Sequence, residues 1–258
     1  MSASTPFPIR RAALALMVAL PFCAMTSVAQ AQDTSQVGVT YGSIDLPNER
    51  QNSLSLDALT THNIGRFGLR FDGSADFRTG DGDGVGYGAG AFGFADLTST
   101  IVAGPYAQLS RQPGGGTLWS LGVAMEYAPM IGFGAAGFFG ESRGGAIPGD
   151  GGHVTNRGVD LTYTLTTGAS ALFYAHKDTV NTNSGDADFY DYGVGLDVPF
   201  GHADDPILSM RYGTLREDTT DTDSRRIELG LTIPLGGGQQ GRMLDTDRGV
   251  LQSTGLNF

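Results

Sequence analysis

Cysteine, basic residues and long apolar runs are all scarce in this sequence, and each scarcity excludes a class of protein. The single cysteine is Cys23, so the chain beyond it can form no disulfide and offers no thiolate nucleophile or metal ligand. The 16 Lys and Arg residues are outnumbered by 27 Asp and Glu residues, which gives a net charge of −11 and disfavours a nucleic-acid partner. Beyond the first residues, no run approaches the roughly 18 apolar residues that a membrane-spanning helix needs.

The first 31 residues have the features of an export signal. Arg10 and Arg11 form a basic start, the apolar segment 13–20 follows, and Ala29 and Ala31 flank Gln30 in the small-x-small pattern of a cleavage site. We therefore predict a signal peptide at residues 1–31 that is removed after Ala31, and an exported mature chain.

Glycine is abundant, at 40 of 258 residues, and the rest of the chain alternates between apolar and polar residues. In the segment 66–77, RFGLRFDGSADF, one parity carries Phe67, Leu69, Phe71, Ala75 and Phe77, and the other carries Arg66, Arg70, Asp72, Ser74 and Asp76. Successive side chains of a strand point to opposite faces, so this pattern predicts a strand with one apolar and one charged face.

The same alternation predicts twelve strands. They are expected at about 37–45, 53–60, 64–77, 84–97, 101–111, 117–127, 130–142, 153–166, 169–177, 187–200, 205–217 and 224–235. The gaps between them alternate between long and short, which is typical of an up-and-down barrel with short periplasmic turns and longer outer loops. We predict an all-β fold, an antiparallel up-and-down transmembrane β-barrel of about 12 strands over residues 32–236, with ten or fourteen strands as alternatives. A secreted β-sandwich explains the long strands less well.

Aromatic residues recur at the spacing expected for the two rims of a membrane. Phe67 and Phe77 are ten residues apart on one face, as are Tyr190 and Phe200, and ten residues of a tilted strand rise by about 25 Å, the height of the apolar band of such barrels. The side chains expected to face lipid are Phe67, Leu69, Phe71, Phe77, Trp119, Leu121, Val123, Tyr127, Tyr190 and Phe200.

The segments 193–201 (GVGLDVPFG) and 229–236 (LGLTIPLG), together with the terminal Phe258, resemble Gram-negative outer-membrane β-barrel proteins of the small porin-like class. The resemblance implies location in the cell outer membrane, contact with outer-membrane lipid and lipopolysaccharide, and insertion by the barrel-assembly machinery. The chain departs from the pattern after Leu235, because 23 residues follow. Either 249–258 is a further strand or 237–258 is a periplasmic tail, and the linker-like GGGQQG favours the tail.

The other parity defines the expected lumen. Its charged residues are four basic and eight acidic: Arg66, Arg70, Arg211 and Arg226 against Asp72, Asp76, Asp96, Glu126, Asp160, Asp191, Asp197 and Glu228. Such a wall needs water or ion-pair partners, so both a narrow water-filled pore and a closed, ion-paired barrel are compatible with it. We expect a channel for passive diffusion of small hydrophilic solutes with a weak cation preference. The alternative is a non-conducting barrel with a structural or adhesin-like surface role.

Catalytic and cofactor motifs are not apparent. The four histidines do not accompany a serine in a phospholipase-like pattern, and no Walker loop, zinc spacing or dinucleotide fingerprint occurs. The run His176–Asp178 (HKD) could supply an acid–base pair but is more often an ordinary cluster at a barrel rim. We therefore expect a protein that is not an enzyme, with no catalytic residues, cofactor or metal.

Overall fold

The computed structural model describes residues 34–46, 50–80, 84–113, 115–147, 152–183, 185–201, 205–218 and 222–236. The predictions of a signal peptide at 1–31 and of a periplasmic tail at 237–258 concern residues outside these ranges. Within them, no helix is long and apolar enough to span a membrane.

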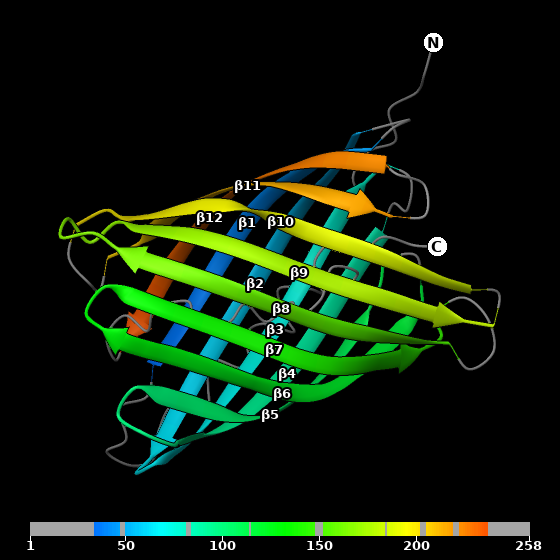
Figure 1. Ribbon diagram of the computed structural model, residues 1–258. Helices are drawn as coiled ribbons and strands as arrows, with labels where there is room; N and C mark the ends of the chain where they lie inside the picture. Colours follow the sequence, from blue (N-terminus) through cyan, green and yellow to red (C-terminus); the bar gives the residue numbers. More distant parts are fainter. Residues whose placement is uncertain are drawn as a thin grey trace. The chain divides into compact units, whose positions relative to one another are not determined.

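The described residues form twelve antiparallel strands that close into a barrel, which confirms the predicted fold class and strand number (Figure 1). Each strand pairs with its neighbours in the chain, and β1 pairs with β12 to complete the ring. The strands are β1 (Thr34–Asp45), β2 (Arg50–Ile64), β3 (Phe67–Thr79), β4 (Gly84–Asp96), β5 (Ile101–Arg111), β6 (Thr117–Met130), β7 (Phe133–Gly144), β8 (His153–Thr164), β9 (Ser170–Thr182), β10 (Gly185–Pro199), β11 (Ile207–Glu217) and β12 (Thr222–Gly236).

The boundary between β2 and β3 differs from the prediction, which began the third strand at residue 64. Ile64 ends β2, and residues 65 and 66 form the turn, where Gly65 has a φ of +64°. That left-handed conformation suits glycine because it has no Cβ. Arg66 therefore lies in the turn and outside the alternation of β3.

The strict alternation of long and short connections was wrong, most clearly in the second half of the chain. Two residues join β9 to β10, where the prediction placed nine, and residues 200–206 separate β10 from β11. The strands β9 and β10 continue as a paired ladder from Tyr190–Lys177 up to Gly185–Thr182. The hydrogen-bonded ladder of β9 and β10 thus extends beyond the apolar part of these strands. The hydropathy pattern marks only the apolar part, which lies farther from the β9–β10 connection.

The alternation of each strand separates an apolar outer face from a polar inner face. Exposed outward side chains include Phe67, Trp119, Val123 and Phe200. We call the end of the barrel at which β1 begins and β12 ends the terminal end, and the opposite end the far end. Outward aromatic residues gather near both: Phe67, Tyr127, Tyr163 and Phe200 at the terminal end, and Phe77, Tyr87, Trp119 and Tyr190 at the far end. Two aromatic rims are typical of membrane barrels.

Candidate functional site

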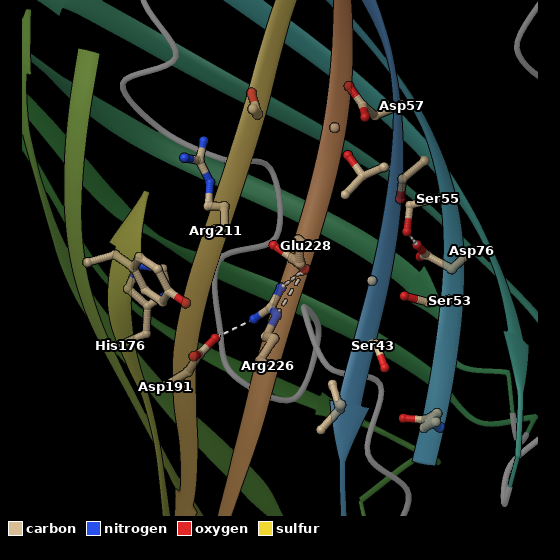
Figure 2. A pocket seen from close by; sticks show the side chains of 18 of the residues that line it. Ser43, Ser53, Ser55, Asp57, Asp76, His176, Asp191, Arg211, Arg226 and Glu228 are labelled. Carbon is tan, nitrogen blue, oxygen red and sulfur yellow. Dashed lines mark hydrogen bonds and ion pairs between the residues drawn. The ribbon is translucent and has the colours of Figure 1, made fainter. Parts of the chain in front are cut away.

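The barrel encloses a polar cavity of about 120 Å³ (Figure 2). Its walls are the inner faces of β1–β3 and β8–β12, from Thr40 on β1 to Arg226 on β12, and no residue of β4–β7 lines it. The cavity therefore lies against one side of the barrel interior.

Arg226 organises the charged wall formed by β10 and β12. Its guanidinium donates across β11 to Asp191 on β10 and, at 2.5 and 2.9 Å, to Glu228 on its own strand (Figure 2). Asp191 is fully buried, so this charge requires the partner that Arg226 provides. The one positive charge of Arg226 balances one of the two carboxylates. Arg226, Asp191 and Glu228 together therefore carry a net negative charge.

One more ion pair and a histidine–carboxylate hydrogen bond belong to this side of the cavity. Arg211 Nη1 lies 3.2 Å from Asp197 Oδ1, and His176 Nε2 lies 2.9 Å from Asp160 Oδ1. The ring of Tyr174 lies next to the imidazole, with centroids 5.7 Å apart. The wall thus carries cations and carboxylates in contact, as expected where charges face a confined space.

The opposite wall, on β2 and β3, is built from hydroxyls and carboxylates. Ser53, Ser55 and Asp57 project from β2 and Asp76 from β3 (Figure 2). Ser74 on β3 also lines this wall. The Ser55 hydroxyl donates to the Asp76 carboxylate. A hydroxyl leaves the charge of the Asp76 carboxylate in place, and Arg78 on β3 adds a cation to the same wall.

The half of the interior away from the cavity is packed. Arg70 Nη1 bonds to Glu126 Oε1 at 2.9 Å, and its guanidinium lies 5.6 Å from the ring centre of Phe92. Phe92 and Tyr106 are almost completely buried, in a cluster completed by Ala124, Ala136, Phe138 and Phe94. This cluster fills the interior beside β4–β7.

Inward glycines allow these large side chains to lie flat against the wall. A Cβ at Gly140 would meet the Tyr106 hydroxyl at 2.2 Å, and a Cβ at Gly213 would meet the Tyr174 hydroxyl at 2.1 Å. The space above the glycines is thus taken by aromatic neighbours. The inward glycines let bulky side chains fold back against the wall and keep the cavity clear.

The interior near the far end contains a second apolar cluster. Ile147, from the connection between β7 and β8, packs inward against Leu118, Val154, Val180, Phe189 and Leu215. Below it, a chain of buried hydrogen bonds crosses four strands from Ser120 through Ser142 and Asn156 to Asp178, with distances of 2.6, 2.6 and 2.9 Å. The apolar cluster and the chain of hydrogen bonds narrow the barrel interior beside β6–β11 near the far end.

Most residues expected in the lumen lie on the inner face. Asp76, Asp160, Asp191, Arg211, Arg226 and Glu228 line the cavity, Asp197 contacts Arg211, and Arg70, Asp72 and Glu126 are buried in the interior. Asp96 is half-buried at the end of β4. Arg66 is a correction: it is exposed in the β2–β3 turn, where its Nη2 donates to the Asp96 carbonyl at 2.8 Å.

The residues expected to face lipid all have outward parity. Eight are exposed, namely Phe67, Leu69, Phe71, Trp119, Leu121, Val123, Tyr127 and Phe200. Phe77 and Tyr190 are half-buried. The outer surface of the barrel is therefore apolar where the sequence predicts it.

Four charged or titratable residues of the interior were missed by the sequence reasoning. Asp57 and Arg78 have inward parity, and both line the cavity. Asp57 lies in the predicted strand 53–60 but was left out of the expected lumen residues, and Arg78 lies one residue beyond the predicted strand 64–77. His176 and Asp178 were assigned to a rim, yet both point inward from β9 while Lys177 between them points outward. The parity of β9 predicts this once the strand is known to continue to Thr182. Among the described residues, no group of His, Cys, Asp or Glu has the arrangement of a metal site.

Comparison with known proteins shows likeness in fold. No protein-family model and no curated protein matches the chain. Among solved structures, the NanC porin has a TM-score of 0.60 at 8% identity, covering 76% of this chain and 98% of its own. The KdgM porin in complex with disordered oligogalacturonate has a TM-score of 0.54 at 11% identity, covering 77% and 98%. An outer membrane channel from Pseudomonas putida F1 has a TM-score of 0.55 at 13% identity, covering 81% and 97%.

The fold is that of outer-membrane β-barrels. At these identities the likeness concerns the architecture, and the lumen of this barrel has to be interpreted from its own side chains. They present a polar, carboxylate-rich cavity beside a packed aromatic half.

Proposed function

We propose that the protein is a porin-like channel of the outer membrane that lets small hydrophilic solutes diffuse passively and carries out no catalysis. The observation that supports this most directly is the polar cavity inside a closed barrel with an apolar outer surface. A hydrophilic path through an apolar shell is what passive diffusion of polar solutes requires. The porins and channels with the same fold support the proposal.

The path for solutes is restricted to the side of β1–β3 and β8–β12. The packed cluster around Phe92 and Tyr106 blocks the other half. A barrel of twelve strands lies between eight-stranded barrels filled by side chains and the open porins of sixteen or more strands. We therefore expect a narrow pore and a small conductance.

The charge of the cavity favours cations weakly. Five carboxylates line it, Asp57, Asp76, Asp160, Asp191 and Glu228, against three guanidiniums, those of Arg78, Arg211 and Arg226, and the imidazole of His176. Rings of Asp and Glu are a common basis of cation preference, and a wall charge acts over about 8 Å at physiological salt. Oligogalacturonate, named with the KdgM porin, is a polyanion, and this lumen is less suited to such a solute.

The test is a planar-bilayer recording of the refolded protein. We expect small single-channel currents and a reversal potential that indicates cation preference, decreasing as salt rises because screening increases. Asp76→Asn should reduce the preference, since Asp76 lines the cavity without a cationic partner among the described residues. Asp223→Asn is the matched control, because Asp223 is exposed on the outer face of β12. Anion preference would contradict the assigned selectivity, and absence of conductance would contradict the channel.

A further inference from the structure

The outer face of β7–β9 near the far end carries cations on three consecutive strands: Arg143, Arg157 and Lys177. Arg157 and Lys177 are direct partners across the β8–β9 ladder. Below Arg157, the outward residues of β8 are Val159, Leu161 and Tyr163, all exposed. Below Lys177, the outward residues of β9 are Ala171, Phe173 and Ala175. The two cations therefore border these outward apolar residues on their far-end side.

The outer two cations of this set have aromatic cross-strand partners on the flanking strands, since Arg143 pairs with Trp119 and Lys177 pairs with Tyr190. Trp119 on β6 and Tyr190 on β10 are outward residues of the far-end rim. On β8 and β9 the rim is interrupted by Arg157 and Lys177. Like charges directly opposite each other on one face of a sheet destabilise it, so this juxtaposition requires a compensating anion.

The protein supplies such an anion to two of the three cations. The Lys177 ammonium donates to Asp188 at 2.6 Å and to the Tyr190 hydroxyl at 3.0 Å, and Arg143 donates to Glu141 at 2.5 Å. Arg157 is exposed and makes no hydrogen bond or ion pair with another residue of the described ranges. The hydrogen-bond donors of the Arg157 guanidinium are therefore available to a ligand on the outer face of the barrel.

We infer that Arg157, together with Lys177, binds a phosphate of the lipopolysaccharide lipid, the phosphorylated glucosamine headgroup of the outer leaflet. A guanidinium matches a phosphate in a bidentate way, and a partly satisfied ammonium next to it adds a second positive charge. Asp188 and Glu141 do not block the anion, since Lys177, Thr179 and Arg143 already bond to them. The inference rests on the outer-membrane location in the proposed function and on the predicted periplasmic tail at 237–258, which would put the terminal end at the periplasm and the far end at the outer leaflet. It is independent of conductance.

The experiment measures lipid retained by the refolded barrel in native mass spectrometry, with lipid A, dephosphorylated lipid A and phosphatidylglycerol offered in separate samples. We expect the unaltered protein to retain lipid A and to retain the dephosphorylated form about tenfold less, as the loss of a charge-assisted hydrogen bond implies. Arg157→Gln should lose most of this retention, the double variant Arg157→Gln/Lys177→Gln should lose more, and Arg157→Lys should lose less than Arg157→Gln.

Arg225→Gln is the matched control. Arg225 is an exposed outward arginine of β12, but its cross-strand partner on β1 is Asp45 rather than a cation. Equal retention of phosphorylated and dephosphorylated lipid, or equal loss in Arg225→Gln, would overturn the inference, as would preference for phosphatidylglycerol. A change of oligomeric state in Arg157→Gln without a change in lipid retention would assign the patch to a second copy of the chain instead. Each result leaves the bilayer test of the channel unaffected.

Discussion

At the scale of single residues, the charged interior consists of groups with different roles. Arg70 and Glu126 are both buried and bonded to each other, and Arg70 also lies over the rings of Phe92 and Phe94. These charges belong to the packed half of the barrel and do not line the cavity. Asp76 and Arg226, in contrast, face the cavity. The residues that act on a passing solute are therefore a subset of the inward charges.

Removal of one member of the Arg70–Glu126 pair should destabilise the barrel strongly. Arg70→Leu leaves the Glu126 carboxylate buried without its cation, which costs about 3–5 kcal/mol in free energy of unfolding. The double variant Arg70→Leu/Glu126→Leu should cost much less, because no charge is left unpaired. Urea titration of the refolded barrels measures both. A double variant as unstable as the single one would show that packing, and not the buried charge, causes the loss.

At the scale of the element, each strand has one face for the surroundings and one for the interior. On β6, Val123 is 58% exposed at mid-strand, and its neighbour Gly122 points inward. A side chain at Gly122 has no room, because its Cβ would lie 2.4 Å from the Phe139 carbonyl oxygen and 2.6 Å from the Tyr106 ring. Inward positions of β6 are therefore as restricted as outward ones, for a steric reason.

Arginine on the outer face of β6 should be costly in a bilayer. Val123→Arg places a guanidinium near the centre of the apolar band and should cost about 2–4 kcal/mol. Ser53→Arg should cost less, because Ser53 lines the polar cavity and the new cation would face its carboxylates. The measurement is the free energy of unfolding of barrels refolded into lipid vesicles. Similar costs for the two variants would show that the outer face of β6 is not in lipid.

At the scale of the whole molecule, closure of the sheet sets the properties of the protein. The pairing of β1 with β12 leaves no free edge in the described barrel, and an edge is where a sheet unravels or joins another chain. The apolar belt with two aromatic rims needs lipid or detergent around it. The closed sheet and the apolar belt together support a location in the outer membrane.

The intact protein should therefore fractionate with outer membranes and need detergent for extraction. In gel electrophoresis, unboiled protein should migrate differently from boiled protein, because the closed barrel resists unfolding by detergent alone. A variant with Val123→Arg should lose the unboiled band at a lower temperature than the unaltered protein. Recovery of the unaltered protein in the aqueous periplasmic extract would contradict the assigned location.

The alternation of hydropathy in the sequence predicted a barrel of about twelve strands, with Phe67, Trp119 and Val123 outside and Asp76, Asp191 and Arg226 inside. That information is local, because successive side chains of a strand alternate in direction whatever the strand pairs with. The ends of strands were less predictable: the ladder of β9 and β10 continues through polar residues, and Arg66 lies in a turn that Gly65 makes possible.

Only the tertiary structure decided what the inward side chains do. Arg70 meets Glu126 across 56 residues of chain, and Arg226 meets Asp191 across 35. These pairs depend on the register and tilt of strands that are distant in sequence, and the division into a packed aromatic half and a polar cavity depends on them too. Which charges are cancelled, and which remain to face a solute, is therefore a property of the closed sheet rather than of any one strand.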